Sequence, residues 1–209
     1  MQKTMGKLFT VCEWIMRLAF VNLLWILFSI AGLLVFGIMP ASVALFTIVR
    51  KWQMKETDIP VLKTFLTVYR QEFKRSNGLG FGLSLGGAFL IFDFLYLRTV
   101  HGALQLALLV PLMIIAAFYI TTALYILPVY VHYDLKMITN LKNAFFLGIL
   151  NFHMTLLMLV TLAAIIILIL YQPGLVPFFS VVSIAWILMF GGIYSFNRIE
   201  ARQSKVSGG

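Results

Sequence analysis

The sequence contains few acidic residues, few charges of any kind and a single cysteine. Of its 209 residues 11% are charged, and seven Asp and Glu stand against sixteen Lys and Arg. Soluble domains average about 25% charged residues, so this scarcity argues against a soluble fold. Cys12 has no second cysteine with which to form an intrachain disulfide. The three histidines lack the paired spacing of a metal site, so no metal and no cofactor is expected.

Hydrophobic residues, by contrast, make up 62% of the chain and gather in long runs. A spanning helix needs about 20 mostly apolar residues. Runs of this kind cover residues 18–37, 78–97, 103–131, 145–170 and 178–196. The sequence therefore predicts an all-α fold: a polytopic transmembrane helical bundle that forms one integral membrane domain over residues 1–209.

The formal net charge of +9 could indicate a nucleic-acid partner. The basic residues flank the hydrophobic runs, however, and do not cluster on one soluble face. Attraction to anionic lipid headgroups explains this pattern better. The expected partner is the lipid bilayer and not nucleic acid, and the expected location is the cell membrane, with several passes.

The distribution of positive charge also predicts orientation, because cytoplasmic loops carry an excess of Lys and Arg. Fifteen of the sixteen basic residues can be placed on one side, and Arg98 alone falls on the other. Both termini are then cytoplasmic, the first through Lys3, Lys7 and Arg17 and the second through a tail that includes Lys205.

An even number of crossings must then separate Arg17 from Arg50. This favours six helices, namely five full spans plus a short returning arm over residues 41–52, with the hairpin at Gly37 and Pro40. The alternative has five spans, an external N-terminus, and the short segment lying flat in the membrane interface.

The cytoplasmic segment 53–77 contains an amphipathic stretch over residues 59–73. Its apolar side chains recur at helical spacing on one stripe, which is formed by Leu62, Phe65, Leu66, Tyr69 and Phe73. Three basic side chains lie off the stripe: Lys63, Arg70 and Lys74. The stretch is interpreted either as an interfacial helix that rests on the membrane or as a docking helix for a cytoplasmic partner.

Asp93 is the only acidic residue inside a predicted span, where it costs about 2.5–3.5 kcal/mol on insertion scales. It either reaches the membrane interface or pairs with Arg98 or His101, about one turn from the outer end of its helix, or it forms a binding site for a proton, a cation or a sugar hydroxyl. Mid-membrane hydroxyls of Tyr119, Thr122 and Tyr125 could line a polar path with it. Such hydroxyls otherwise bond to backbone carbonyls or across helices.

Gly78, Gly82 and Gly86 recur every four residues on one helix face. They do not match a phosphate-binding loop, and their spacing favours close approach of another helix. Asn22, one turn inside the first span, is expected to bond to a neighbouring helix. No grouping of catalytic residues can be assembled, so an enzyme is not expected.

Several segments of the first hundred residues also resemble a known family. Residues 22–28 (NLLWILF), 37–41 (GIMPA) and 50–52 (RKW) resemble the N-terminal signature of YesL-type bacterial membrane proteins. The pattern of Phe65, Tyr69, Arg70, Phe73, Lys74 and Asn77 is similar to the cytoplasmic helix of that family.

The resemblance implies a Gram-positive, Bacillus-like source and an association with carbohydrate uptake, but it implies no catalytic residues. The leading hypothesis is a non-enzymatic accessory component of a carbohydrate ABC uptake system, with sugar permease subunits as partners. The alternative is an autonomous small-solute transporter or channel that uses Asp93 and the mid-membrane hydroxyls.

Overall fold

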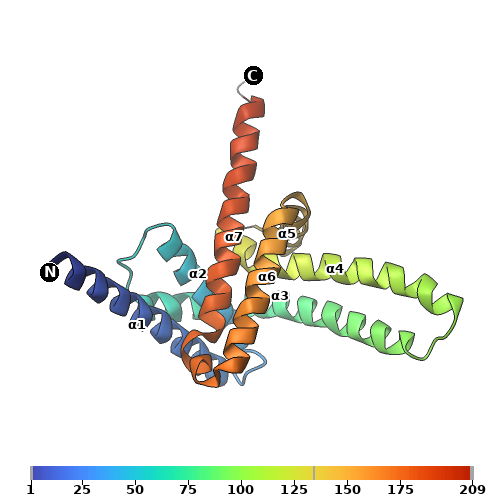
Figure 1. Cartoon of the computed structure of the whole chain (residues 1–209), viewed down its shortest axis with the longest axis horizontal. Coiled ribbons are helices and arrows are strands. Elements are labelled where there is room, and N and C mark those ends of the chain that lie inside the picture. Colours follow the sequence, from blue (N-terminus) through green and yellow to red (C-terminus); the bar gives the residue numbers. More distant parts are fainter. Residues whose placement is uncertain (1, 134, 208–209) are drawn as a thin grey trace.

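A computed structural model describes residues 2–133 and 135–207, with side chains for residues 9–133 and 135–201. Over these residues the chain forms seven α-helices and no strand (Figure 1), which confirms the predicted all-α fold. The helices are α1 (Gln2–Ala31), α2 (Ile38–Gln53), α3 (Val61–Leu97), α4 (Ala103–His132), α5 (Met137–Leu150), α6 (Phe152–Tyr171) and α7 (Val176–Ser207). The side chains of Lys3, Lys7 and Lys205, assigned above to the cytoplasmic side, lie outside the described ones.

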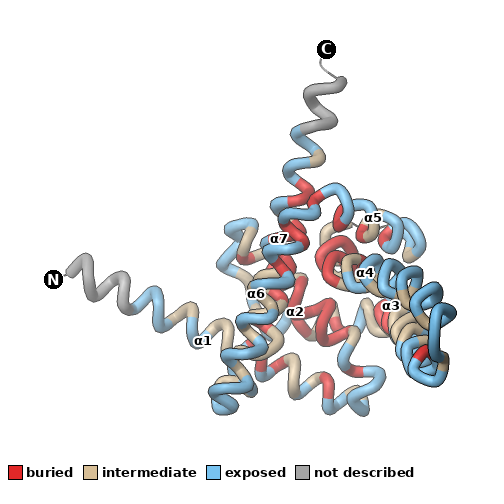
Figure 2. Tube along the Cα trace, turned by 45° about the vertical axis from the view of Figure 1, so that its right-hand side comes forward, coloured by how far each residue is buried: buried red, intermediate tan, exposed pale blue. Residues whose placement is uncertain are grey.

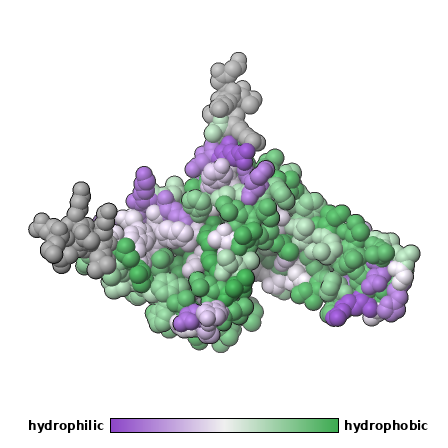
Figure 3. Space-filling model, viewed as in Figure 1, coloured by the Kyte–Doolittle hydropathy of each residue, from purple (hydrophilic) through white to green (hydrophobic). Residues whose placement is uncertain are grey.

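Five segments are long and apolar enough to cross a membrane. They are Phe9–Ala31, Val61–Leu97, Ala103–His132, Phe152–Tyr171 and Pro173–Ala201. Hydrophobic side chains cover most of the visible surface of α3, α4, α6 and α7, and hydrophilic ones gather at the ends of these helices (Figure 3). This is the surface expected of a protein that is solvated by lipid.

Helix α2 is the predicted short arm, and it returns antiparallel to α1. The indole Nε1 of Trp25 donates to Oγ of Ser42 at 3.0 Å, and the rings of Trp14 and Trp52 are 5.5 Å apart. Ten of the 16 residues of α2 are buried. Helix α2 therefore lies in the centre of the protein (Figure 2) and not flat on a membrane surface.

The turn between α1 and α2 lies earlier than predicted, at residues 32–37. Leu33 and Leu34 adopt left-handed backbone conformations with φ of 58° and 61°, and Pro40 lies inside the first turn of α2, where its missing N–H costs little. A Cβ on Gly32 would lie 2.4 Å from the Cα of Gly37. The hairpin closes here because two glycines allow the backbones to touch.

Helix α3 joins two segments that the sequence pattern predicts as separate elements. The predicted amphipathic stretch and the span at 78–97 form one helix of 37 residues. The apolar stripe is divided between core and surface: Phe65 and Tyr69 are buried, whereas Leu62 is 48% exposed. Its interpretation as an interfacial helix stays a prediction. Phe65 is fully buried, its ring is 5.3 Å from that of Phe28, and Tyr69 donates to the Phe28 carbonyl at 3.1 Å.

The predicted span at 145–170 is divided at Asn151, and part of the predicted polar loop at 132–143 is helical. Asn151 ends α5 and begins α6, with its backbone at φ −115° and ψ 46°. Its buried side chain donates to the Leu147 carbonyl at 3.2 Å. The Leu147 carbonyl also accepts the backbone N–H of Asn151 at 3.1 Å, so the amide side chain adds a second hydrogen bond to the last turn of α5 at the point where the helix ends.

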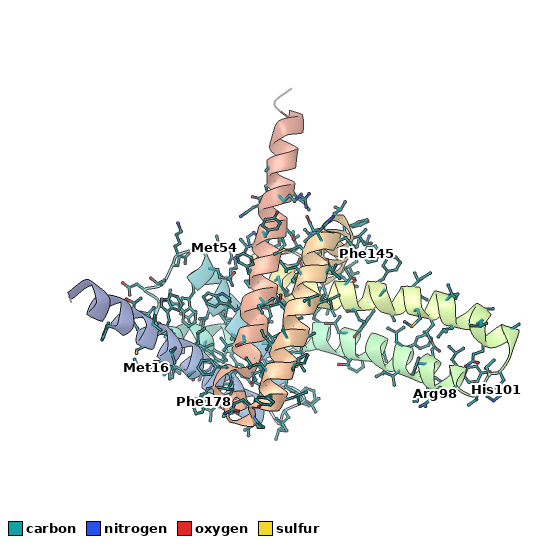
Figure 4. The ribbon with its side chains drawn as sticks, viewed as in Figure 1. Met16, Met54, Arg98, His101, Phe145 and Phe178 are labelled. Carbon is teal, nitrogen blue, oxygen red and sulfur yellow. The ribbon has the colours of Figure 1, made fainter. Side chains whose placement is uncertain are left out.

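Two long hairpins diverge from the buried centre. The outer halves of α3 and α4 form an arm that projects sideways, while α6 and α7 run along another direction in both views (Figures 1 and 2). The arm is defined here as residues 81–121, and its tip carries Arg98 and His101 (Figure 4).

Two hydrogen bonds bear on the predicted topology. Arg17 Nη1 donates to the Thr57 carbonyl at 2.9 Å, so the start of the first span lies beside the segment assigned to the cytoplasm. Asn77 Nδ2 donates to the Phe36 carbonyl at 3.0 Å, so the tip of the α1–α2 hairpin lies level with the middle of α3. The first bond agrees with an internal N-terminus. Which side each terminus occupies stays a prediction.

Candidate functional site

An apolar hollow lies between the base of the arm and α5, and is called the arm groove. It has a volume of about 820 Å³ and is open on one side. Helix α3 contributes Leu79, Gly82, Leu83 and Gly86, and α4 contributes Ile115, Phe118, Tyr119 and Thr122. The third wall is α5, on which Phe145 lies beside the base of α4 (Figure 4). Nearly all of the lining is apolar.

Helix α5 forms its wall with a single face. The lining residues Met137, Leu141 and Phe145 recur every four positions, as do Ile138, Lys142 and Phe146, and this spacing keeps them on one side of a helix. The adjoining face of α5 is buried through Asn140, Ala144, Leu147 and Gly148, and it packs closely on α4, because a Cβ at Gly148 would lie 2.1 Å from the Thr121 side chain. Lys142 is the only charged residue in the lining.

Two of the predicted hydroxyl residues line this groove, and a third does not. Tyr119 donates to the Leu83 carbonyl at 2.7 Å, and Thr122 donates to the Phe118 carbonyl at 2.8 Å. Tyr125 is fully buried in the core, where its hydroxyl accepts a hydrogen bond from Thr155 at 3.3 Å. The three hydroxyls therefore do not form one continuous path.

Asp93 is separated from these hydroxyls. It lies ten residues beyond Leu83 on α3, which is about 15 Å along the helix at 1.5 Å per residue. It is half-buried, and among the described side chains it forms no ion pair with Arg98 or His101. The structure does not bring Asp93 together with Tyr119, Thr122 and Tyr125.

The glycines of α3 have different environments. A Cβ on Gly82 would meet nothing within 4 Å, and one on Gly78 would meet only the end of Met137 at 3.6 Å. Gly86 adjoins the Tyr119 ring, 3.3 Å from a Cβ. The tightest approach to another helix is at Gly80, where a Cβ would lie 2.3 Å from the Met39 side chain. Gly80 and Gly86 thus permit close packing within the chain, whereas Gly82 faces open space in the groove.

The basic residues Lys63, Arg70 and Lys74 are all exposed on the first half of α3. Lys63 and Arg70 line a shallow depression of about 530 Å³ together with Leu62, Leu66, Thr67 and Gln71. The buried stripe of Phe65 and Tyr69 faces the other way, into the core. This half of α3 is thus fixed to the protein by one face and presents basic side chains on the other.

A polar cluster between α2, α3 and α4 was not predicted from the sequence. Tyr130 donates to Glu72 at 2.5 Å, the Arg75 guanidinium lies 5.2 Å from the Tyr130 ring centre, and Arg50 donates to Nδ1 of His132 at 3.3 Å. Next to His132, burial and then the nearby Glu200 carboxylate raise the pKa of the Tyr133 phenol. The sequence could not predict this cluster, because the spacing of Glu72 and Arg75 indicates only that they share a helix face. The residues that they contact lie about 60 positions further along the sequence.

Five apolar helices of spanning length and an exposed apolar exterior define the class of this protein, a multi-pass helical membrane protein. A family model described as "Protein of unknown function, DUF624" matches residues 18–94. Within the described part of the chain, no three metal-ligating side chains lie together.

Three proteins of Bacillus subtilis (strain 168) align with most of the chain. The uncharacterized protein YteU is 41% identical over 183 residues, which cover 88% of this chain and 82% of YteU. The uncharacterized protein YesL is 35% identical over 194 residues, covering 93% and 91%. The uncharacterized protein YesV is 30% identical over 195 residues, covering 93% and 94%. The chain therefore belongs to the YesL-type DUF624 family, and no solved structure matches it significantly.

Proposed function

We propose that this protein is a non-enzymatic, multi-pass accessory subunit of the cell membrane that docks onto another membrane complex. The observation that carries the proposal is the two-sided first half of α3. Its apolar face is held in the core by Phe65 and Tyr69, and its opposite face presents Lys63, Arg70 and Lys74 to the surroundings. A rigid helix with a fixed basic face suits recognition of an acidic segment, because little ordering is needed on binding.

The partner in this proposal is a permease of a carbohydrate ABC uptake system. The link to carbohydrate uptake comes from the resemblance to YesL-type proteins, whereas the docking surface comes from the geometry of α3. The exposed apolar arm would lie against lipid or against the membrane helices of the permease. Such a subunit needs no catalytic group and no cofactor.

Copurification from native membranes tests the proposal. The tagged wild-type protein is expected to copurify with sugar permease subunits, and the double variant Lys63→Glu, Arg70→Glu is expected to lose them. Like-charge contacts at an interface cost several kcal/mol, so the loss should be nearly complete. The matched control is Lys55→Glu, Lys136→Glu, which makes the same change in charge at exposed positions outside this face.

Recovery of a stable, partner-free protein from native membranes would overturn the proposal. If both double variants lost the permease subunits equally, the change in net charge alone would account for the effect. The basic face of α3 would then not be the docking surface.

A further inference from the structure

We propose that the arm groove binds one anionic phospholipid, with an acyl chain along α3 and α4 and its headgroup at Lys142. The inference uses a surface different from the basic face of α3, so it stands independently of the docking function proposed above. Its volume of about 820 Å³ falls within the range of about 300–1,000 Å³ that is typical of ligand sites.

The walls of the groove fit a hydrocarbon chain. Gly82 leaves open space on the α3 wall, since a Cβ there would meet nothing within 4 Å. The hydroxyls of Tyr119 and Thr122 already donate to backbone carbonyls. With its donors engaged in this way, the lining offers a sugar few polar contacts, whereas its apolar side chains favour removal of an acyl chain from water.

The rim of the groove fits an anionic headgroup. Lys142 is exposed, no Asp or Glu contributes to the lining, and no ion pair joins its ammonium group to a described side chain. A basic residue at a membrane surface is worth about 1 kcal/mol toward anionic lipid. Lys142 thus gives the groove a preference for negative charge that the apolar lining alone would not supply.

The position of the groove favours a lipid over other apolar ligands. Two of its walls belong to α3 and α4, which are candidate spans, and the third is the shorter helix α5 that joins α4 to α6. Such a groove opens toward the acyl chains of a bilayer and carries its charge at a helix between two spans, where headgroups lie. Lipid also needs no partner protein to reach it.

Native mass spectrometry of the full-length protein tests the site. The protein is extracted from vesicles of phosphatidylglycerol and phosphatidylcholine in equal amounts with matched acyl chains. Wild type is expected to retain one phosphatidylglycerol in preference to phosphatidylcholine. Lys142→Gln should lower retained phosphatidylglycerol roughly fivefold and leave phosphatidylcholine unchanged, and Gly82→Phe should remove both lipids.

Matched controls are Lys136→Gln, at the start of α5 but outside the lining, and Ser84→Phe, on α3 but outside the lining. Both should retain lipid as wild type does. If Gly82→Phe does not fold, as judged by its thermal melting, Gly82→Leu takes its place.

Three results would overturn the inference. Equal effects of Lys142→Gln and Lys136→Gln would show that headgroup selection is not at the groove. Release of phosphatidylglycerol by inorganic phosphate, without loss in Gly82→Phe, would show an anion site and no lipid site. An intermolecular disulfide formed by Gly82→Cys in a Cys12→Ser background would place a second copy of the chain in the groove.

Discussion

Asn22 of α1 donates a hydrogen bond from Nδ2 to the carbonyl oxygen of Pro177 in α7, over 2.8 Å. Its Oδ1 accepts from the backbone N–H groups of Val181 and Val182, at 3.0 Å each. The side chain is fully buried. One amide thus joins the first and last helices of the chain, and the predicted bond from Asn22 to a neighbouring helix is confirmed.

Asn22→Leu is expected to lower the free energy of unfolding by about 1–3 kcal/mol. An interhelical hydrogen bond in a membrane protein is worth about 0.6 kcal/mol on average, and the variant loses three such bonds. The leucine side chain also differs in shape from the amide that it replaces. Unfolding by titrated denaturing detergent measures the difference. Asn197→Leu, at an exposed position of α7, is the control and should change stability little. An equal loss in both variants would mean that the bridge contributes nothing beyond side-chain polarity.

Gly37 should not tolerate even a methyl group. A Cβ there would lie 2.3 Å from the Ser29 carbonyl oxygen, which is backbone and cannot rotate away. We expect Gly37→Ala to destabilise the protein by about 1–3 kcal/mol through overpacking. Gly82→Ala is the matched comparison, because open space surrounds it and alanine favours a helix by about 0.5–1 kcal/mol. Thermal melts should move in opposite directions, and a shift in the same direction would contradict the tight turn.

The predicted six-helix topology can be tested by labelling cysteines in a Cys12→Ser background with a membrane-impermeant maleimide. Arg98→Cys and Val35→Cys are expected to react in intact cells, and Lys55→Cys only after permeabilisation. Val35 is 75% exposed at the tip of the α1–α2 hairpin, so the probe can reach it. If Val35→Cys reacts only after permeabilisation, the hairpin tip, which bonds to Asn77 through the Phe36 carbonyl, lies on the cytoplasmic side and α2 does not cross.

Composition and hydropathy were enough to predict the helical class and the run of apolar helices. These properties depend on the lipid solvent. A segment inside a bilayer must pair its backbone N–H and C=O groups within itself, which a helix does. The antiparallel return of α2 could also be predicted, because placing both Arg17 and Arg50 on the cytoplasmic side calls for an even number of crossings between them. Whether α2 crosses the membrane stays a prediction. The break at Asn151 could not, since an apolar run gives no sign that one asparagine will bond back to Leu147.

The candidate site was predicted only in fragments. Tyr119, Thr122 and Gly82 were each identified, but the wall that makes them a groove is α5, which hydropathy had assigned to a polar loop and part of a span. The orientation of α5 depends on Gly148 packing beside Thr121, a contact between residues far apart in the sequence. Glu72 and Tyr130 were missed for the same reason, because helical spacing relates residues only within one helix.

Asp93→Asn discriminates between the docking function and an autonomous transporter. Asp93 is half-buried on the arm, and an acid in an apolar setting costs about 2.5–3.5 kcal/mol, so neutralising it should maintain or raise stability. Copurification with permease subunits should be unchanged, and vesicles containing the purified protein should show no solute flux that depends on this residue.

Asp58→Asn, at an exposed position before α3, controls for the change of charge. A flux present in wild type and in Asp58→Asn but lost in Asp93→Asn would favour the transporter, and it would require the arm to move, because Asp93 lies about 15 Å along α3 from the carbonyl that Tyr119 contacts.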